Sequence, residues 1–322
     1  FTVQDHAATL IESLNGIQAF HSQLRGCDPQ RNALVEEACY RITGGANEFT
    51  RDATSNYREL DISTDSFAAG RSQIINNGGL LSFSVGYDSS SITNGDQFSS
   101  SGDRIMLGSS YTYDQTGWDK YVSLSLGFGT YESERLIDIA GTLPGGEVVM
   151  GGMSSIDQDV ITANIGFGTS ERFDFGTAGG YVKPAVDVWV TNIHADEASV
   201  SGTPISPIAA ESNNLMLSVA PSVQVGIERE VGADTMFNGF LRAGFTGSTL
   251  DALEMEGKLA GVSDADGTFT NDSGIDDFVG ELAVGMEIYG TENDFSLAFE
   301  YLREEGSLSQ YEAIGATFEW RF

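Results

Sequence analysis

From about residue 40 to the end of the chain, one set of alternate positions is apolar and the other set is small, polar or charged. In "LLSFSVGY" the odd positions from Leu81 to Tyr87 are apolar, and "YVSLSLGFG" repeats the pattern from Val122 to Phe128. A period of two is typical of β-strands that have one apolar face. The pattern therefore predicts an all-β fold, and the next question is what the apolar faces contact.

The alternating segments predict twelve strands separated by turn residues. Their expected bounds are 40–50, 57–74, 80–90, 102–114, 120–133, 157–171, 180–194, 213–229, 235–247, 277–290, 294–304 and 311–322. The connections after the even-numbered strands are short, whereas those after the third, fifth, seventh and ninth strands are long, at 91–101, 134–156, 195–212 and 248–276. Short turns that alternate with long loops are typical of outer-membrane barrels.

The faces opposite the apolar stripes carry charges of both signs, which suits a hydrated lumen better than the dry interior of a β-sandwich. The charged residues expected to face the lumen are Lys183, Asp187, Glu228, Arg242, Glu281, Glu287, Glu300, Glu319 and Arg321. The chain has no run of about 18 apolar residues, so no transmembrane helix is predicted. We expect a twelve-stranded antiparallel transmembrane β-barrel whose outer face contacts lipid.

The N-terminal part has a different period. Residues 5–25, "DHAATLIESLNGIQAFHSQLR", place apolar side chains at helical spacing, and a shorter helix is expected to begin at Asp28. A twelve-stranded barrel is intermediate between filled and open barrels, so its lumen should admit one helix of roughly 10–12 Å diameter. We expect residues 1–39 to form a lumen plug and residues 40–322 the barrel. The plug residues expected to contact lumen charges such as Arg242, Glu281 and Glu319 are Glu12, Asn15, Gln18, His21 and Arg25.

The two cysteines, Cys27 and Cys39, have a spacing that matches neither a redox CxxC motif nor a zinc site. In an oxidising compartment they are expected to form a structural disulfide, and two unpaired thiols are the alternative.

The net charge of −31 argues against a nucleic-acid partner, because the phosphates would be repelled. In the acidic segment 251–277, "DADG" at Asp264 and Asp266 resembles the start of a calcium loop, but the closing glutamate is absent. A solvated loop is favoured over weak Ca²⁺ or Mg²⁺ binding. No nucleotide, zinc or serine-hydrolase motif occurs, and the three histidines are far apart in the sequence, so neither a cofactor nor a catalytic site is expected.

A C-terminal barrel preceded by one helix and ending in "FEWRF" resembles the translocator β-domain of autotransporters, the type V secretion proteins of Gram-negative bacteria. The resemblance implies an outer-membrane domain, monomeric, that anchors and helps to export a covalently linked N-terminal passenger. It implies that Phe318, Trp320 and Phe322 face lipid and are read by the barrel-assembly machinery. Membrane lipid and lipopolysaccharide are the other expected partners.

Some autotransporters cut their linker inside the barrel at an Asn-Asn pair, but the helix predicted at residues 5–25 has only a lone Asn15. We therefore do not expect an enzyme. The alternatives to a translocator are a stand-alone outer-membrane pore for small solutes, or an outer-membrane enzyme with its site in the external loops.

Overall fold

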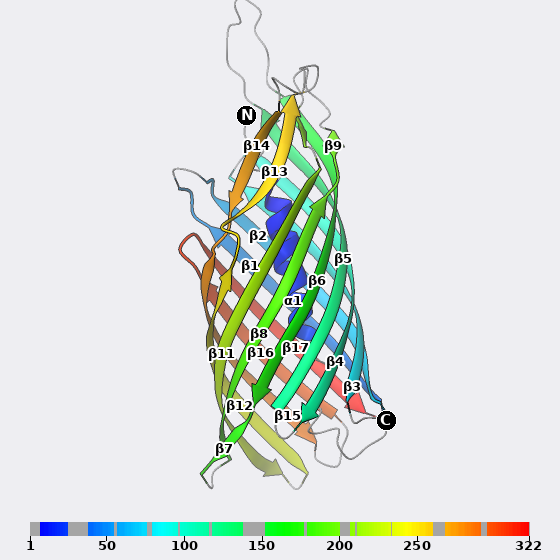
Figure 1. Cartoon of the computed structure of the whole chain (residues 1–322), viewed down its shortest axis with the longest axis vertical. Coiled ribbons are helices and arrows are strands. Elements are labelled where there is room, and N and C mark those ends of the chain that lie inside the picture. The colour runs from blue at the N-terminus through cyan, green and yellow to red at the C-terminus, as the bar shows by residue number, and fades with distance from the viewer. Residues whose placement is uncertain are drawn as a thin grey trace, which may run out of the picture.

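The computed structural model describes residues 7–24, 38–54, 57–75, 79–95, 97–115, 118–137, 152–176, 179–199, 207–209, 211–232, 234–259, 268–290 and 295–321. These residues form a closed antiparallel β-barrel with one helix, α1 (Ala8–Gln23), inside it (Figure 1). The long strands of the barrel wall are β1 (Cys39–Arg51), β2 (Leu60–Ile74), β3 (Leu80–Asn94), β4 (Phe98–Gln115), β5 (Trp118–Ile137), β6 (Gly152–Glu171), β8 (Gly180–Ala195), β11 (Ser212–Gly232), β12 (Thr235–Ser248), β15 (Phe278–Gly290), β16 (Phe295–Glu305) and β17 (Ser309–Arg321).

The wall closes where its last strand pairs with its first. β17 and β1 are antiparallel and stay in register from Arg321 opposite Cys39 to Ser309 opposite Arg51, and β8 joins β6 to β11. A closed wall leaves no strand edge, so its backbone groups are paired without help from solvent. The predicted twelve-stranded barrel with an N-terminal helix is confirmed.

The side chains of the wall are arranged inside out compared with a water-soluble protein. Large apolar residues point outward on every long strand, with exposed fractions that reach 58% for Phe83, 63% for Leu215 and 61% for Ile314. Serine, threonine and asparagine side chains such as Ser125, Thr162 and Asn164 are buried on the inner face. Such a wall is stable where lipid covers its outside. Among the described residues, no helix has the length and apolar character needed to cross a bilayer.

Several wall strands extend further than the alternation predicted. β4 begins at Phe98 where the prediction began at 102, and β6 begins at Gly152 where it began at 157. The additional residues, "FSSS" at 98–101 of β4 and "GMSSI" at 152–156 of β6, are mostly small or polar and lack a continuous apolar stripe. Alternation reports apolar contact on one face only, so it cannot mark the part of a strand that rises beyond the lipid.

The long connections contain a second sheet that the sequence did not predict. Its strands are β9 (Ala198–Ser199), β10 (Pro207–Ala209), β13 (Ala252–Leu259) and β14 (Thr268–Gly274), in the spatial order β14-β13-β10-β9. It lies at the end of the barrel opposite the C-terminus (Figure 1). A three-residue strand, β7 (Phe173–Phe175), extends the wall at the other end, which we call the short-turn end. The expected loops 195–212 and 248–276 are therefore partly sheet.

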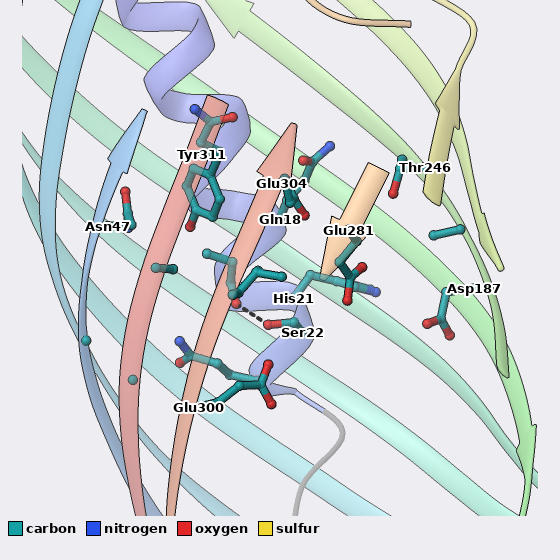
Figure 2. A pocket seen from close by; sticks show the side chains of 18 of the residues that line it. Gln18, His21, Ser22, Asn47, Asp187, Thr246, Glu281, Glu300, Glu304 and Tyr311 are labelled. Carbon is teal, nitrogen blue, oxygen red and sulfur yellow. Dashed lines mark hydrogen bonds between the residues drawn. The ribbon is translucent and has the colours of Figure 1, made fainter. Parts of the chain in front are cut away.

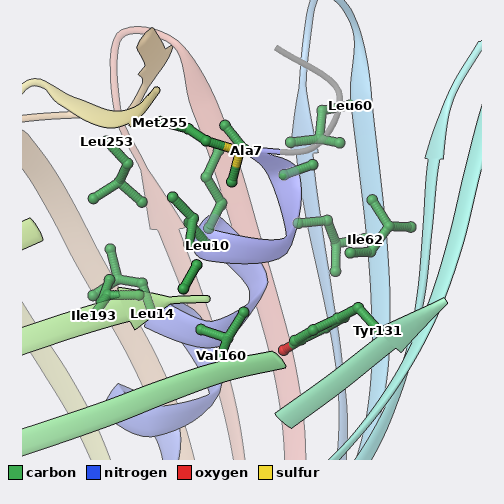
Figure 3. Packing of buried hydrophobic residues seen from close by; sticks show 14 of the residues in the cluster. Ala7, Leu10, Leu14, Leu60, Ile62, Tyr131, Val160, Ile193, Leu253 and Met255 are labelled. Carbon is green, nitrogen blue, oxygen red and sulfur yellow. The ribbon is translucent and has the colours of Figure 1, made fainter. Parts of the chain in front are cut away.

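The apolar core lies inside the lumen at the long-connection end. The first turns of α1 supply Leu10 and Leu14, the wall supplies residues such as Ile62 and Ile193, and β13 closes the cluster from above (Figure 3). Leu253 and Met255 of β13 are completely buried in it. The second sheet and the plug therefore form one packed unit at this end of the barrel.

Candidate functional site in the barrel lumen

The helix α1 is the element around which the lumen is organised. It runs inside the barrel and packs mainly against β2, β3, β4, β5, β6 and β8 (Figure 1). Most of its residues are buried, including the polar Thr9, Glu12 and Ser13. A helix that is buried on most of its faces needs partners for its polar side chains as well as for its apolar ones.

Arg104 of β4 supplies the main polar attachment of the helix. Its Nη1 donates to the main-chain carbonyl oxygens of Ser13 at 2.8 Å and Glu12 at 3.3 Å. Its Nη2 contacts Glu12 Oε1 at 3.0 Å and Asp88 Oδ2 at 2.6 Å. All the charged side chains of this cluster are buried. One guanidinium thus binds both the backbone and a side chain of α1, which uses the planar fork that lysine lacks.

Tyr131 of β5 completes the cluster from the other side. Its hydroxyl donates to Glu12 Oε2 and lies 2.7 Å from Ser13 Oγ. One turn earlier, Thr9 Oγ1 donates to Gln158 Oε1 of β6 at 2.8 Å. Because both oxygens of Glu12 have donors, its buried carboxylate has the partners that burial requires.

Gly16 lets Arg104 approach the helix backbone. A Cβ atom at Gly16 would lie 1.4 Å from Arg104 Nη2. No side chain other than hydrogen fits there while the guanidinium keeps its position. The glycine in the middle of α1 is thus explained by a close approach and not by a break in the helix.

The C-terminal half of α1 is held by a mixture of apolar and polar contacts. Ile17, Phe20 and Leu24 form a second buried cluster with Ala68 and Met106. The last turn of α1 also makes polar contacts. His21 Nε2 lies 3.3 Å from Ser123 Oγ, and Ser110 Oγ donates to the carbonyl of Leu24. The His21 ring also lies near the rings of Tyr121 and Trp189, with both centroid distances at 6.3 Å.

A cavity of about 560 Å³ remains on the other side of α1. Gln18 and Ser22 of the helix face it, and β1, β12, β15, β16 and β17 form its opposite wall (Figure 2). Arg242 binds Glu281 through Nε at 2.6 Å and Glu300 through Nη2 at 2.8 Å. The predicted lumen charges on this wall therefore pair with one another across strands.

Most predicted lumen charges lie where parity placed them, on the inner face. Lys183, Asp187, Arg242, Glu281, Glu287 and Glu300 line the cavity. Glu228 accepts from Arg172 and from the Tyr289 hydroxyl nearer the short-turn end. Glu319 and Arg321 lie on the same face of β17 as Thr317, and Thr317 lines the cavity. On the neighbouring β1, Glu319 is opposite Arg41 and Arg321 is opposite Cys39.

The described helix is attached through a wall charge that the sequence did not single out, and its expected contacts with Arg242, Glu281 and Glu319 stay a prediction. Glu12 binds Arg104, whereas Arg242 binds Glu281 and Glu300. Gln18 faces the cavity, and Asn15 also lines it. The sequence did not single out Arg104, Asp88 or Tyr131. Strand parity could have placed Arg104 on the inner face, because Ile105 and Leu107 face outward and alternate positions of β4 must then face inward.

Several predicted sites fall outside the described residues, namely Arg25, Cys27, Asp264, Asp266, Phe322 and the expected short helix from Asp28. Cys39 begins β1 and is buried. Because Cys27 lies outside the described residues, the Cys27–Cys39 disulfide stays a prediction. On the outer face near the short-turn end, Trp320 stacks on Phe318 at 5.5 Å and on Tyr40 at 5.8 Å. In the described part of the chain, no group of three or more His, Cys, Asp or Glu side chains is arranged to hold a metal ion.

A closed antiparallel wall that is apolar outside and polar inside, with a helix through its lumen, defines an outer-membrane β-barrel with an occupied pore. The autotransporter beta-domain family model matches residues 41–301, and the chain belongs to this family. Its role is therefore that of a translocator in the bacterial outer membrane, and the family implies a linked N-terminal passenger. Translocator domains of this family are generally not enzymes.

Solved structures with the same fold are distant in sequence. The translocator domain of the autotransporter NalP from Neisseria meningitidis has a TM-score of 0.70 at 10% identity, over 98% of this chain and 97% of that one. The beta domain of the Bordetella autotransporter BrkA gives 0.61 at 14% identity, over 89% and 100%. The transport unit of AIDA-I from Escherichia coli gives 0.60 at 13% identity, over 100% of both chains. No curated protein sequence matches this chain significantly.

Proposed function

We propose that α1 is a resident plug that keeps the barrel closed once a passenger has been exported, and that Arg104 of β4 is its main attachment. The observation that supports this proposal is the insertion of one buried guanidinium against the backbone of α1 at Gly16, between Glu12 and Asp88. A buried arginine whose partners lie on two elements holds those elements together, because separating them leaves unpaired charges in the lumen.

The orientation follows from the connections. Short turns face the periplasm in outer-membrane barrels and longer loops face outward. The N-terminal end of α1 lies beside β13, at the long-connection end (Figure 3). A passenger joined to this end of the helix therefore leaves the barrel on the cell surface.

The plug proposal is tested by conductance of the full chain in planar lipid bilayers. Arg104→Gln removes the fork and leaves the barrel wall intact, so we expect openings that are larger or more frequent than those of the wild type. Arg303→Gln is the matched control. Arg303 is partly exposed, lies on the outer face of the wall and pairs there with Glu305 and Glu312, so its loss does not touch the helix. Equal conductance of the wild type and Arg104→Gln would contradict the proposal.

We further propose that residues 1–39 act as the plug unit and 40–322 as the barrel, with a Cys27–Cys39 bond that fixes the chain between them. Cys39 is the first residue of β1, so a bond there would anchor the linker at the periplasmic mouth. Intact mass in the presence and absence of a reductant, followed by alkylation, tests this bond. Alkylation of both cysteines without prior reduction would exclude it.

We propose that the plug is not cut inside the lumen. Asn15 is the only asparagine of α1, and the nearby acidic residue Glu12 is already engaged by Arg104 and Tyr131. An engaged carboxylate is better suited to a structural role than to proton transfer. The mass of the chain recovered from membranes after expression with a test passenger decides the matter, since a break within residues 8–23 would refute the proposal.

A further inference from the structure

The plug does not fill the lumen evenly. α1 packs mainly against the wall from β2 to β8, and the cavity of about 560 Å³ separates it from the wall formed by β12, β15, β16, β17 and β1. A polar space of this size holds water. A hydrated space thus runs beside the helix.

The cavity has an excess of negative charge. Six carboxylates and three Arg or Lys side chains line it. Glu281 and Glu304 lie directly opposite each other on β15 and β16, and Arg242 binds Glu281 and Glu300. The Arg242 guanidinium therefore lies among three carboxylates, and Figure 2 labels all three of these glutamates. Like charges in opposite register positions repel, and a mobile cation relieves that repulsion.

The same cavity becomes apolar toward the long-connection end. There it is lined by Ile11 and Leu14 of α1, Phe49 of β1, Tyr311 of β17, and Ile275. We call these five residues the collar. Asp276 lies at the same level, but its carboxylate accepts from the backbone N–H groups of the turn between β16 and β17. Apolar constrictions in pores oppose ion passage by excluding water.

We propose that the space beside α1 is a cation-selective path, in which Glu281, Glu300 and Glu304 around Arg242 select the ion and the collar limits its passage to the cell surface. The proposal rests on α1 as the resident plug and adds an ion pathway to it. Carboxylates in a narrow space with low-dielectric walls raise the local concentration of cations and lower that of anions. The selected ions are those that carry current in the bath, such as K⁺ or Na⁺, and no fixed metal site is implied.

The selectivity is measured as the reversal potential of the full chain in planar bilayers under a KCl gradient. We expect a potential of the sign that K⁺ preference gives, and a severalfold loss of that preference in the double variant Glu281→Gln with Glu304→Gln. The matched control is Glu132→Gln with Glu134→Gln, which removes the same charge from two exposed positions on the outer face of β5. An anion preference in the wild type, or an equal loss in both double variants, would overturn the proposal.

The collar is tested in the same bilayers with Phe49→Ala and Tyr311→Ala together. Both changes widen an apolar constriction without altering charge, so we expect a severalfold increase in current with the cation preference unchanged. No increase, or no current from either protein, would overturn the proposed path. The plug proposal fails separately, if Arg104→Gln leaves the conductance unchanged.

Discussion

At the scale of single residues, the lumen is organised by one buried arginine. Arg104 lies between two carboxylates and two helix carbonyls, and it is 1% exposed. Loss of one partner from a buried ion pair typically costs about 3–5 kcal/mol, because the remaining charge has no solvent. The pairing therefore matters less as a source of net stability than as a device that fixes where α1 lies.

Gly16→Ala is expected to weaken the plug even though alanine favours helix formation by about 1 kcal/mol over glycine. The added Cβ would lie 1.4 Å from Arg104 Nη2, so the guanidinium must leave its carbonyl acceptors. Hydrogen exchange of α1 in the detergent-solubilised barrel should become faster. Ser22→Ala, on the helix face toward the cavity, is the control and should leave exchange unchanged. Slower exchange in Gly16→Ala would show that helix propensity outweighs the contact with Arg104.

Strand parity could predict the inward position of these charges, but not their pairing. Parity depends only on which neighbours are apolar, and it placed Arg242, Glu281 and Glu300 on the inner face as observed. Pairing depends on where α1 lies across the lumen, and nothing in the alternation carries that information. The expected contacts of α1 with Arg242 and Glu281 were inferred from the polarity of the helix and of the inner face alone.

At the scale of elements, β13 shows how a segment read as a loop becomes part of the core. Leu253, Met255 and the first turns of α1 share one apolar cluster. The sequence of β13, "ALEMEGKL", alternates over a short distance and lies in an acidic region. Short strands outside the lipid have few apolar positions, so the pattern that identified the wall was too weak to identify this sheet.

Leu253→Ala is expected to loosen the second sheet and the N-terminal half of α1 without opening the wall. Removal of a buried leucine side chain to alanine costs about 2–5 kcal/mol where the cavity cannot collapse. Hydrogen exchange should accelerate in β13, β14 and the first turns of α1. Glu256→Ala, an exposed neighbour on the same strand, serves as control. Unchanged exchange in Leu253→Ala would mean that β13 does not support the helix.

The last strand has an outer aromatic stripe that we propose is read during membrane assembly. Phe318 and Trp320 face outward from β17 and stack beside Tyr40, and Phe322 continues the same parity in sequence. We expect Phe318→Ser with Trp320→Ser to reduce the amount of folded barrel in membranes, measured by its heat-dependent mobility on gels. Ile314→Ser, on the same outer face, is the control. If Ile314→Ser lowered the amount of folded barrel as much as the double variant does, the aromatic stripe would have no role beyond ordinary contact with lipid.

At the scale of the whole molecule, the outer wall determines the environment. Apolar side chains cover the outside from β2 to β17, and the chain carries a net charge of −31 concentrated in the lumen, the rims and the connections. Acidic rims suit the divalent cations that bridge lipopolysaccharide, which we propose as a partner along with lipid. The barrel architecture was predictable because lipid imposes the same alternation on every strand. The eccentric plug was not, because a single helix leaves no comparable repeat.

The central claim is that α1 closes a pore through a lipid-embedded wall. The most direct measurement compares the conductance in planar bilayers of the full chain with that of the chain without residues 7–24. The account predicts low conductance with the helix present and a large increase in its absence. Equal conductance of the two proteins would contradict it.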